Sequence, residues 1–146
     1  MRCTTLEKLV RTQFNVIGVE SKQPSSILDT FRQYNSLTGT PVYIWKKETG
    51  LYRLDLSNVK IPQTKTVQQV LNYIIKHQHN SIFILSDFAQ QLNNAFIEKS
   101  LVNIAKDKNN QKNIFILDES LDLSIKFKGI ALETKKLFQM KLQRAA

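Results

Sequence analysis

Two short, continuous apolar runs constrain the fold of this chain more than any other feature of its sequence. Ile82–Leu85 and Ile114–Leu117 contain only Ile, Phe and Leu, and a stretch with helical spacing of apolar residues lies between them. A strand with one face in water alternates apolar and polar residues, whereas a strand of a covered parallel sheet is apolar throughout. The two runs therefore predict a three-layer α/β fold, with a mainly parallel sheet and helices on both faces.

Three further segments are predicted to bring the sheet to about five strands. Val16–Val19 and Val42–Trp45 are short runs rich in β-branched or aromatic residues, and Leu51–Leu56 alternates as a half-buried strand does. The turn Glu48–Gly50 separates the last two segments. No internal repeat is present, and 146 residues suffice for a single domain with its own core.

Helices are expected between these strands. Thr4 and Glu7 have the spacing of a capping box, Pro24–Ser26 is a helix start, and Gly39 is a helix end. The most regular helical pattern is Val67, Val70, Leu71, Ile74 and Ile75. In the helix before the last strand, the side chains expected to face inward are Leu92, Phe96, Ile97, Leu101, Ile104 and Ala105.

The net charge of +9 is concentrated near the C-terminus. The segment 126–146 is predicted to be largely helical, and it carries six basic side chains against the single acid Glu133. A basic segment can bind an acidic protein, nucleic acid or an anionic membrane, or it can be a solvated helix. A membrane-surface helix is not favoured, because the apolar and basic residues do not separate around a helix. The candidate partner-binding residues are Lys126, Lys128, Lys135, Lys136, Lys141 and Arg144.

The segment after the first predicted strand lacks the features of a phosphate-binding loop. Such loops are rich in glycine, so that main-chain N–H groups can approach the phosphates, and they supply a lysine. Glu20–Ser26 has no glycine, contains Pro24 without an N–H group, and begins with an acid. Nucleotide hydrolysis by these residues is therefore not expected. A small anion could still bind at the helix start around Ser25 and Ser26.

Acids follow two of the predicted strands, at Asp87 and at Asp118–Glu119. An apolar strand ending in Asp-Glu is the form that holds Mg²⁺ in P-loop ATPases. Buried strands commonly end in polar residues, so a structural role is the preferred interpretation. We predict that Lys22, Ser25, Asp87 and Asp118 form the edge of a vestigial nucleotide site.

Other candidate chemistry is weaker. His77 and His79 are two residues apart on a helix, so one metal ion cannot easily reach both rings. Cys3 is the only cysteine, which excludes an internal disulfide. We therefore predict no catalytic residues, no metal and no cofactor.

Aromatic and basic residues gather around the second strand and its turn. Trp45, Tyr52 and Arg53 could form an edge on which nucleic-acid bases stack. The alternative is that they close the core, and this is preferred because Trp45 continues an apolar strand.

Several motifs together resemble those of a known family. They are Tyr43-Ile44-Trp45, Gly50-Leu51-Tyr52-Arg53 and Asp87-Phe88. Over residues 5–118 the chain resembles the N-terminal, degenerate AAA-like domain of an AAA-type ATPase family encoded by a conserved reading frame in plastids and cyanobacteria. Ala89-Gln90 and the sequence after Asp118 depart from the family pattern. The resemblance implies a degenerate P-loop or AAA-like fold that precedes a separate catalytic domain, which this sequence does not contain.

The expected function is thus a non-catalytic interaction or regulatory module with a protein partner. The alternatives are nucleic-acid binding through the basic segment, a small-anion sensor at Lys22, and the N-terminal part of an AAA-type ATPase. No apolar run reaches the roughly 20 residues of a membrane span. The N-terminus has no secretory signal, so the cytoplasm is expected, or the plastid stroma for a plastid-encoded chain.

Overall fold

The computed structural model describes residues 1–56, 58–108 and 111–135. Helices and strands alternate along most of this length, and η1 and η2 are short 3₁₀ turns. In chain order the elements are α1 (Cys3–Val10), β1 (Val16–Glu20), α2 (Pro24–Thr38), β2 (Val42–Lys46), β3 (Gly50–Arg53), α3 (Val67–Lys76), β4 (Ser81–Ser86), η1 (Ala89–Asn93), α4 (Ala95–Lys106), β5 (Lys112–Asp118), η2 (Ile125–Phe127) and β6 (Ala131–Glu133).

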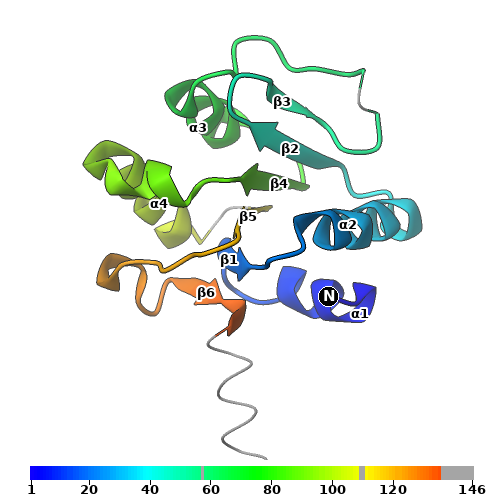
Figure 1. The fold of residues 1–146 in the computed structure, drawn as a ribbon, viewed down its shortest axis with the longest axis horizontal. Helices are drawn as coiled ribbons and strands as arrows, with labels where there is room; N and C mark the ends of the chain where they lie inside the picture. The colour runs from blue at the N-terminus through cyan, green and yellow to red at the C-terminus, as the bar shows by residue number, and fades with distance from the viewer. Residues whose placement is uncertain (57, 109–110, 136–146) are drawn as a thin grey trace, which may run out of the picture.

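One sheet contains six strands in the order β3-β2-β4-β5-β1-β6 (Figure 1). Neighbouring strands run parallel, except that β2 and β3 form an antiparallel pair. The prediction of a mainly parallel α/β sheet is confirmed, although the number of strands is six and not about five. The additional strand is β6, which pairs with β1 from Val16↔Ala131 to Gly18↔Glu133.

The prediction that segment 126–146 is helical is wrong for residues 126–133. This stretch contains the end of the η2 turn and the whole of β6. Only three residues form β6, and their pairing with β1 more than 100 residues away is not visible in a local pattern. Thr134 and Lys135 have helical backbone. Residues 136–146, with Lys136, Lys141 and Arg144, lie outside the described part of the chain.

Helices cover both faces of the sheet, as predicted for a three-layer fold. Figure 1 shows α1 and α2 on one side and α3 and α4 on the other. Two buried clusters correspond to the two sides of the sheet, one containing Leu6 and Phe31 and the other containing Val70 and Leu101. Alternate residues of the apolar strands contribute to each: Phe115 to the first and Ile116 to the second. The two continuous runs are apolar because both of their faces are covered.

Two local predictions about helices and one about a strand are wrong. Thr4 lies inside α1, whose N-cap is Arg2 without a side-chain cap, so no capping box forms with Glu7. Phe96 is 78% exposed, because α4 begins at Ala95 and directs the neighbouring Ile97 into the core. The strand predicted over residues 51–56 ends at Arg53.

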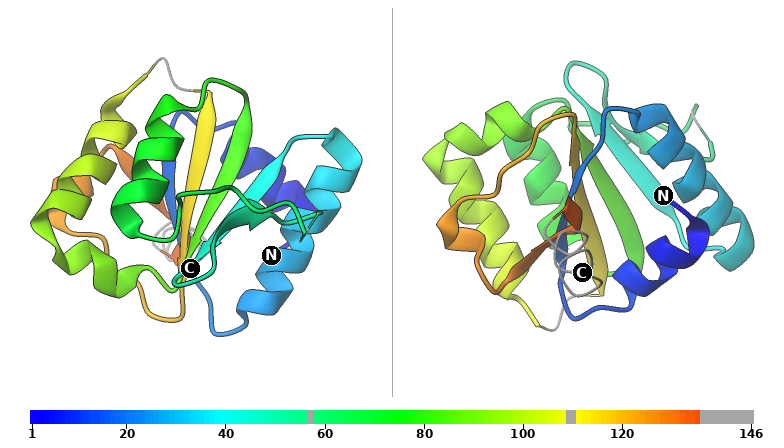
Figure 2. Two further views of the ribbon diagram at one scale, coloured as in Figure 1. Left: turned by 90° about the horizontal axis from the view of Figure 1, so that it is seen from above. Right: turned by 60° about the horizontal axis from the view of Figure 1, so that its bottom comes forward.

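The connection from β5 to β6 contains no α-helix. Figure 2 shows this connection, residues 119–130, on the same side of the sheet as α4. Its buried side chains pack directly on β1 at Gly18: a Cβ atom there would lie 3.0 Å from Leu121 Cδ2 and 3.4 Å from Leu123 Cδ1. The close approach of the connection therefore favours glycine at this strand position, because a larger residue would have to displace the ends of these leucine side chains.

Candidate functional site

The carboxyl ends of β1 and β5 mark the place where a ligand of an open α/β sheet would bind. These two strands are neighbours, and the chain leaves them on opposite faces of the sheet. After β1 it enters α2, on the face of α1, and after β5 it enters the connection on the face of α4. Such a topological switch point opens a crevice outside the strand ends.

A small pocket of about 270 Å³ lies at this edge. Three of the four residues predicted for a vestigial nucleotide site, Ser25, Asp87 and Asp118, line it together. The fourth, Lys22, is exposed on the loop after β1 and is not part of the lining. The complete lining is Pro24, Ser25, Leu28, Lys46, Ser86, Asp87, Leu117, Asp118 and Glu119.

The charge of this pocket opposes phosphate binding. Its lining has three carboxylates, from Asp87, Asp118 and Glu119, against the one ammonium group of Lys46. A triphosphate brought to this edge would be repelled by the excess of negative charge. Pro24 occupies the first turn of α2 and provides no N–H group where a phosphate-binding helix start would provide one.

The carboxylate of Asp118 is engaged within the fold. Its Oδ2 accepts a hydrogen bond of 2.8 Å from the amide of Ala89, the first residue of η1, and its Oδ1 accepts one of 2.7 Å from the amide of Glu119. The main chain is also joined here, since the amide of Ser21 donates to the Asp118 carbonyl at 2.9 Å and that of Asp87 donates to the Leu117 carbonyl at 2.9 Å. This acid thus connects the ends of β5 and β4, as expected of a structural residue.

Glu20, the last residue of β1, has a similar role on the other side of the edge. Its Oε1 accepts a hydrogen bond of 2.8 Å from the amide of Leu121 and lies 3.4 Å from Nζ of Lys135. The Leu121 amide, opposed in part by burial and assisted by the Lys135 ammonium group, lowers the pKa of Glu20 below its ordinary value. The carboxylate is therefore kept ionised and holds the β5–β6 connection to β1.

The three described basic residues of the C-terminal segment have different surroundings. Lys126 pairs with Glu98 at 3.2 Å, and Lys135 pairs with Asp122 at 2.6 Å as well as with Glu20. The pKa of Lys135 is raised above its ordinary value, and its hydrogen bond to Asp122 is the main cause. Lys128 is exposed. Two of the three are therefore already paired with acids of the same chain.

The predicted aromatic-basic edge is divided between core and surface. Trp45 is 1% exposed, and its Nε1 donates to the Thr64 carbonyl at 2.8 Å, which confirms the core interpretation for this residue. Tyr52 is half-buried on β3. Arg53 forms a two-point ion pair with Asp55, with both N–O distances 2.9 Å, so its guanidinium is held by a neighbouring carboxylate.

His77 lies in an aromatic cluster. Its ring contacts those of Tyr43, Phe83 and His79, and its Nε2 is 2.9 Å from Ser81 Oγ. Burial lowers the pKa of His77, with smaller contributions from the charges of His79 and Lys112. Over the described ranges, no three His, Cys, Asp or Glu side chains are grouped so that they could bind a metal ion.

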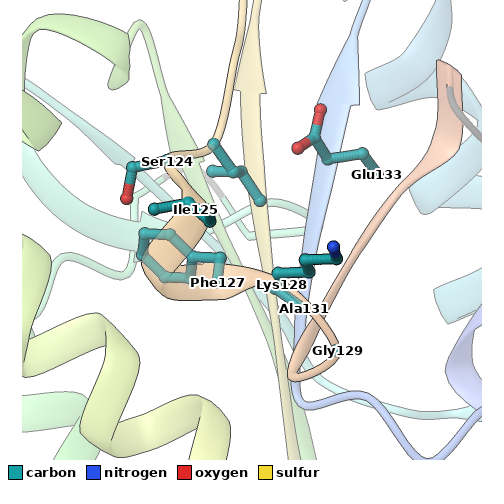
Figure 3. A pocket seen from close by; sticks show the side chains of 8 residues that line it. Ser124, Ile125, Phe127, Lys128, Gly129, Ala131 and Glu133 are labelled. Atoms are coloured by element: carbon teal, nitrogen blue, oxygen red, sulfur yellow. The ribbon is translucent and has the colours of Figure 1, made fainter.

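A second pocket, of about 450 Å³, lies beside β6 where the β5–β6 connection has only a 3₁₀ turn. Figure 3 shows Ile125 and Phe127 extending from this turn and Glu133 from β6. Phe127 is buried, whereas Ile125 is 83% exposed at the rim. Neither this pocket nor the ion-pair cluster at Lys135 is predictable from a local sequence pattern, because both depend on the position of β6.

In the part of the chain that the structure describes, no helix combines the length and the apolar character needed to cross a bilayer.

Comparison with known families gives one match. The family model described as "SpoVK-like AAA ATPase, N-terminal domain" matches residues 3–131, which is most of the chain and includes every element up to the start of β6. No curated protein and no solved structure matches the chain.

Proposed function

Because the chain belongs to the family of SpoVK-like AAA ATPase N-terminal domains, we propose that it is a non-catalytic interaction or regulatory module of an AAA-type ATPase. One observation carries the proposal. Glu20 ends β1 and Asp118 ends β5, and the carboxylate of each accepts a hydrogen bond from a main-chain amide of the same domain. The edge at which a nucleotide would bind thus functions as an internal joint of the fold.

The chemistry of the edge supports the non-catalytic part of this proposal. Phosphoryl transfer depends on donors and cations that surround the phosphates and neutralise their charge. Here the pocket has a net negative lining, Lys22 lies outside it, and Pro24 removes a donor at the start of α2. These features act in the same direction, against a bound triphosphate.

A protein is the partner we propose, docked through the surface of the domain. The pocket beside β6 and the exposed Ile125 that lines it provide apolar surface for such a contact. Nucleic-acid binding has less support, because Trp45 is buried and both Lys126 and Lys135 are paired with acids. The anion-sensor alternative is likewise weakened by the acidic pocket.

The narrower kinship with the plastid and cyanobacterial family is part of the proposal. Its support is the set of three short motifs around Trp45, Arg53 and Asp87. We also propose a location in the cytoplasm, or in the plastid stroma for a plastid-encoded chain.

Two hydrolysis assays test this function. The chain alone is expected to release no phosphate from Mg-ATP above the blank. An AAA-type ATPase that carries this domain is expected to hydrolyse ATP both with and without residues 1–135, but with a changed rate or a changed response to its partner. Hydrolysis by the chain alone would contradict the non-catalytic assignment, and identical behaviour with and without the domain would contradict the regulatory one.

For an assay of partner binding, a shortened chain is best ended at Lys135. A truncation at Ser124 removes β6 and the buried Phe127 and so damages the sheet. A chain ending at Lys135 keeps every described strand and removes only residues 136–146. Loss of a partner from this shorter chain would assign the contact to the removed residues.

A further inference from the structure

Lys135, the last described residue, is surrounded by carboxylates from three separate parts of the fold. Its Nζ lies 2.6 Å from Asp122 Oδ1, 3.4 Å from Glu20 Oε1 and 4.0 Å from Glu133 Oε2. It also donates a hydrogen bond to the carbonyl of Leu121. One ammonium group thus joins the end of β1, the β5–β6 connection and β6.

Glu20 extends this cluster into the main chain. The carboxylate oxygen that faces Lys135 also accepts the hydrogen bond from the Leu121 amide. Lys135 and the Leu121 amide therefore share one acceptor. A displacement of Lys135 removes a positive charge from beside this carboxylate oxygen. It thereby alters the hydrogen bond from the Leu121 amide, which attaches the connection to β1.

The element that Lys135 secures is weakly held otherwise. β6 has three residues and lies at the edge of the sheet, where β1 is its one neighbour among the described strands. Short edge elements open locally at a low free-energy cost. Ion pairs near the surface are worth little singly, and salt screens them. A network of this kind can therefore hold β6 closed and still be released by a modest competing charge.

We infer that Lys135 is an electrostatic latch, which holds β6 and the β5–β6 connection against the end of β1 until a competing charge releases it. Closed, the latch fixes β6 and the Leu121 connection against the end of β1. Released, it frees β6 and the connection together, so that a charged contact on the domain loosens this edge of the sheet. This inference rests on the proposed function, because a regulatory module must transmit its state to a neighbouring domain.

Hydrogen exchange measured by mass spectrometry on the intact chain tests the latch. In Lys135→Met the amides of residues 119–123 and 131–134 are expected to exchange about two- to fivefold faster than in the original chain. Strand β4, in the centre of the sheet, is expected to be unchanged. Lys128→Met is the matched control, because Lys128 is an exposed lysine of the same segment. Lys135→Arg keeps the charge and is expected to restore slow exchange.

Salt provides the readout that a purely structural lysine would not show. Raising the ionic strength from about 50 mM to about 1 M should accelerate exchange at the same segments in the original chain and have little effect in Lys135→Met. Equal acceleration in Lys128→Met, uniform acceleration that includes β4, or no change in Lys135→Met would each overturn the latch. A Mg-ATP titration of the same samples separates the two proposals, since nucleotide binding would refute the proposed function without altering the exchange result.

Discussion

The carboxylate of Glu20 accepts a hydrogen bond of 2.8 Å from the main-chain amide of Leu121, 101 residues further along the chain. Glu20 ends β1, the position after which a phosphate-binding fold would present its glycine-rich loop. Here that position is used to hold the β5–β6 connection. The relationship explains how an AAA-like domain can keep its sheet while its ligand edge serves the stability of the fold.

Glu20→Gln should lower stability at neutral pH and have little effect in acid. The folded-state pKa of Glu20 lies below its ordinary value of 4.5, chiefly because the Leu121 amide donates to the carboxylate. The ionised group therefore stabilises the fold above pH 4.5, and this contribution is lost as the pH falls through the folded-state pKa. Urea unfolding of both proteins at several pH values measures the difference. A difference that stays constant down to about pH 3 would show that the charge has no part in it.

Gly18→Ala should destabilise the domain by about 1–3 kcal/mol, because the new methyl group meets the side chain of Leu121. The distance from such a Cβ to Leu121 Cδ2 would be 3.0 Å. The matched background is Leu121→Ala, which removes that contact. Chemical denaturation of the four proteins gives a double-mutant cycle. Gly18→Ala should cost clearly less in the Leu121→Ala background, and an equal cost in both would mean that another neighbour sets the penalty.

Thr64→Val should cost about 1–3 kcal/mol, because it leaves a buried amide without its acceptor. Thr64 is 1% exposed, and its hydroxyl accepts from the Leu51 amide at 2.9 Å and donates to the Ile61 carbonyl at 2.8 Å. Thr64→Ser keeps the hydroxyl and should retain most of the stability. Tryptophan fluorescence reports unfolding at this site directly, since the indole N–H of Trp45 donates a hydrogen bond to the Thr64 carbonyl. Equal losses in the Val and Ser variants would attribute the effect to packing.

Stability should also fall as the pH drops below about 6.5 because of His77. Burial is the main cause that lowers the folded-state pKa of His77 from its ordinary value of 6.5, and the charges of His79 and Lys112 lower it further. The unfolded chain therefore binds a proton more readily, and the free energy of unfolding decreases with falling pH until the folded-state pKa is reached. Thermal unfolding between about pH 7.5 and about pH 5 should show this decrease, and His77→Gln should reduce it. An identical pH profile in His77→Gln would remove this residue as the cause.

The central strands could be predicted because their signal is local. Ile82–Leu85 and Ile114–Leu117 are apolar on both faces, and the structure covers both faces of β4 and β5. Strand β6 could not be predicted in this way. Its three residues are a strand only because they pair with β1, and that pairing depends on the path of the β5–β6 connection.

The candidate site was predictable to the same extent. Ser25, Asp87 and Asp118 meet in one pocket because the carboxyl ends of parallel strands share one edge. The partner of Glu20 and the acids around Lys135 could not be found, since each contact joins residues from distant parts of the sequence. The contribution of Lys135 in particular depends on β6, whose position only the structure provides.

Calorimetric titration of the intact chain with Mg-ATP is the most direct test of the account. The acidic edge, where Glu20 and Asp118 accept hydrogen bonds from main-chain amides, predicts no saturable heat up to about 1 mM nucleotide. This corresponds to a binding free energy weaker than about 4 kcal/mol. A sub-millimolar dissociation constant that a change at Ser25 or Asp118 abolishes would contradict it, because it would show that this edge still binds the nucleotide.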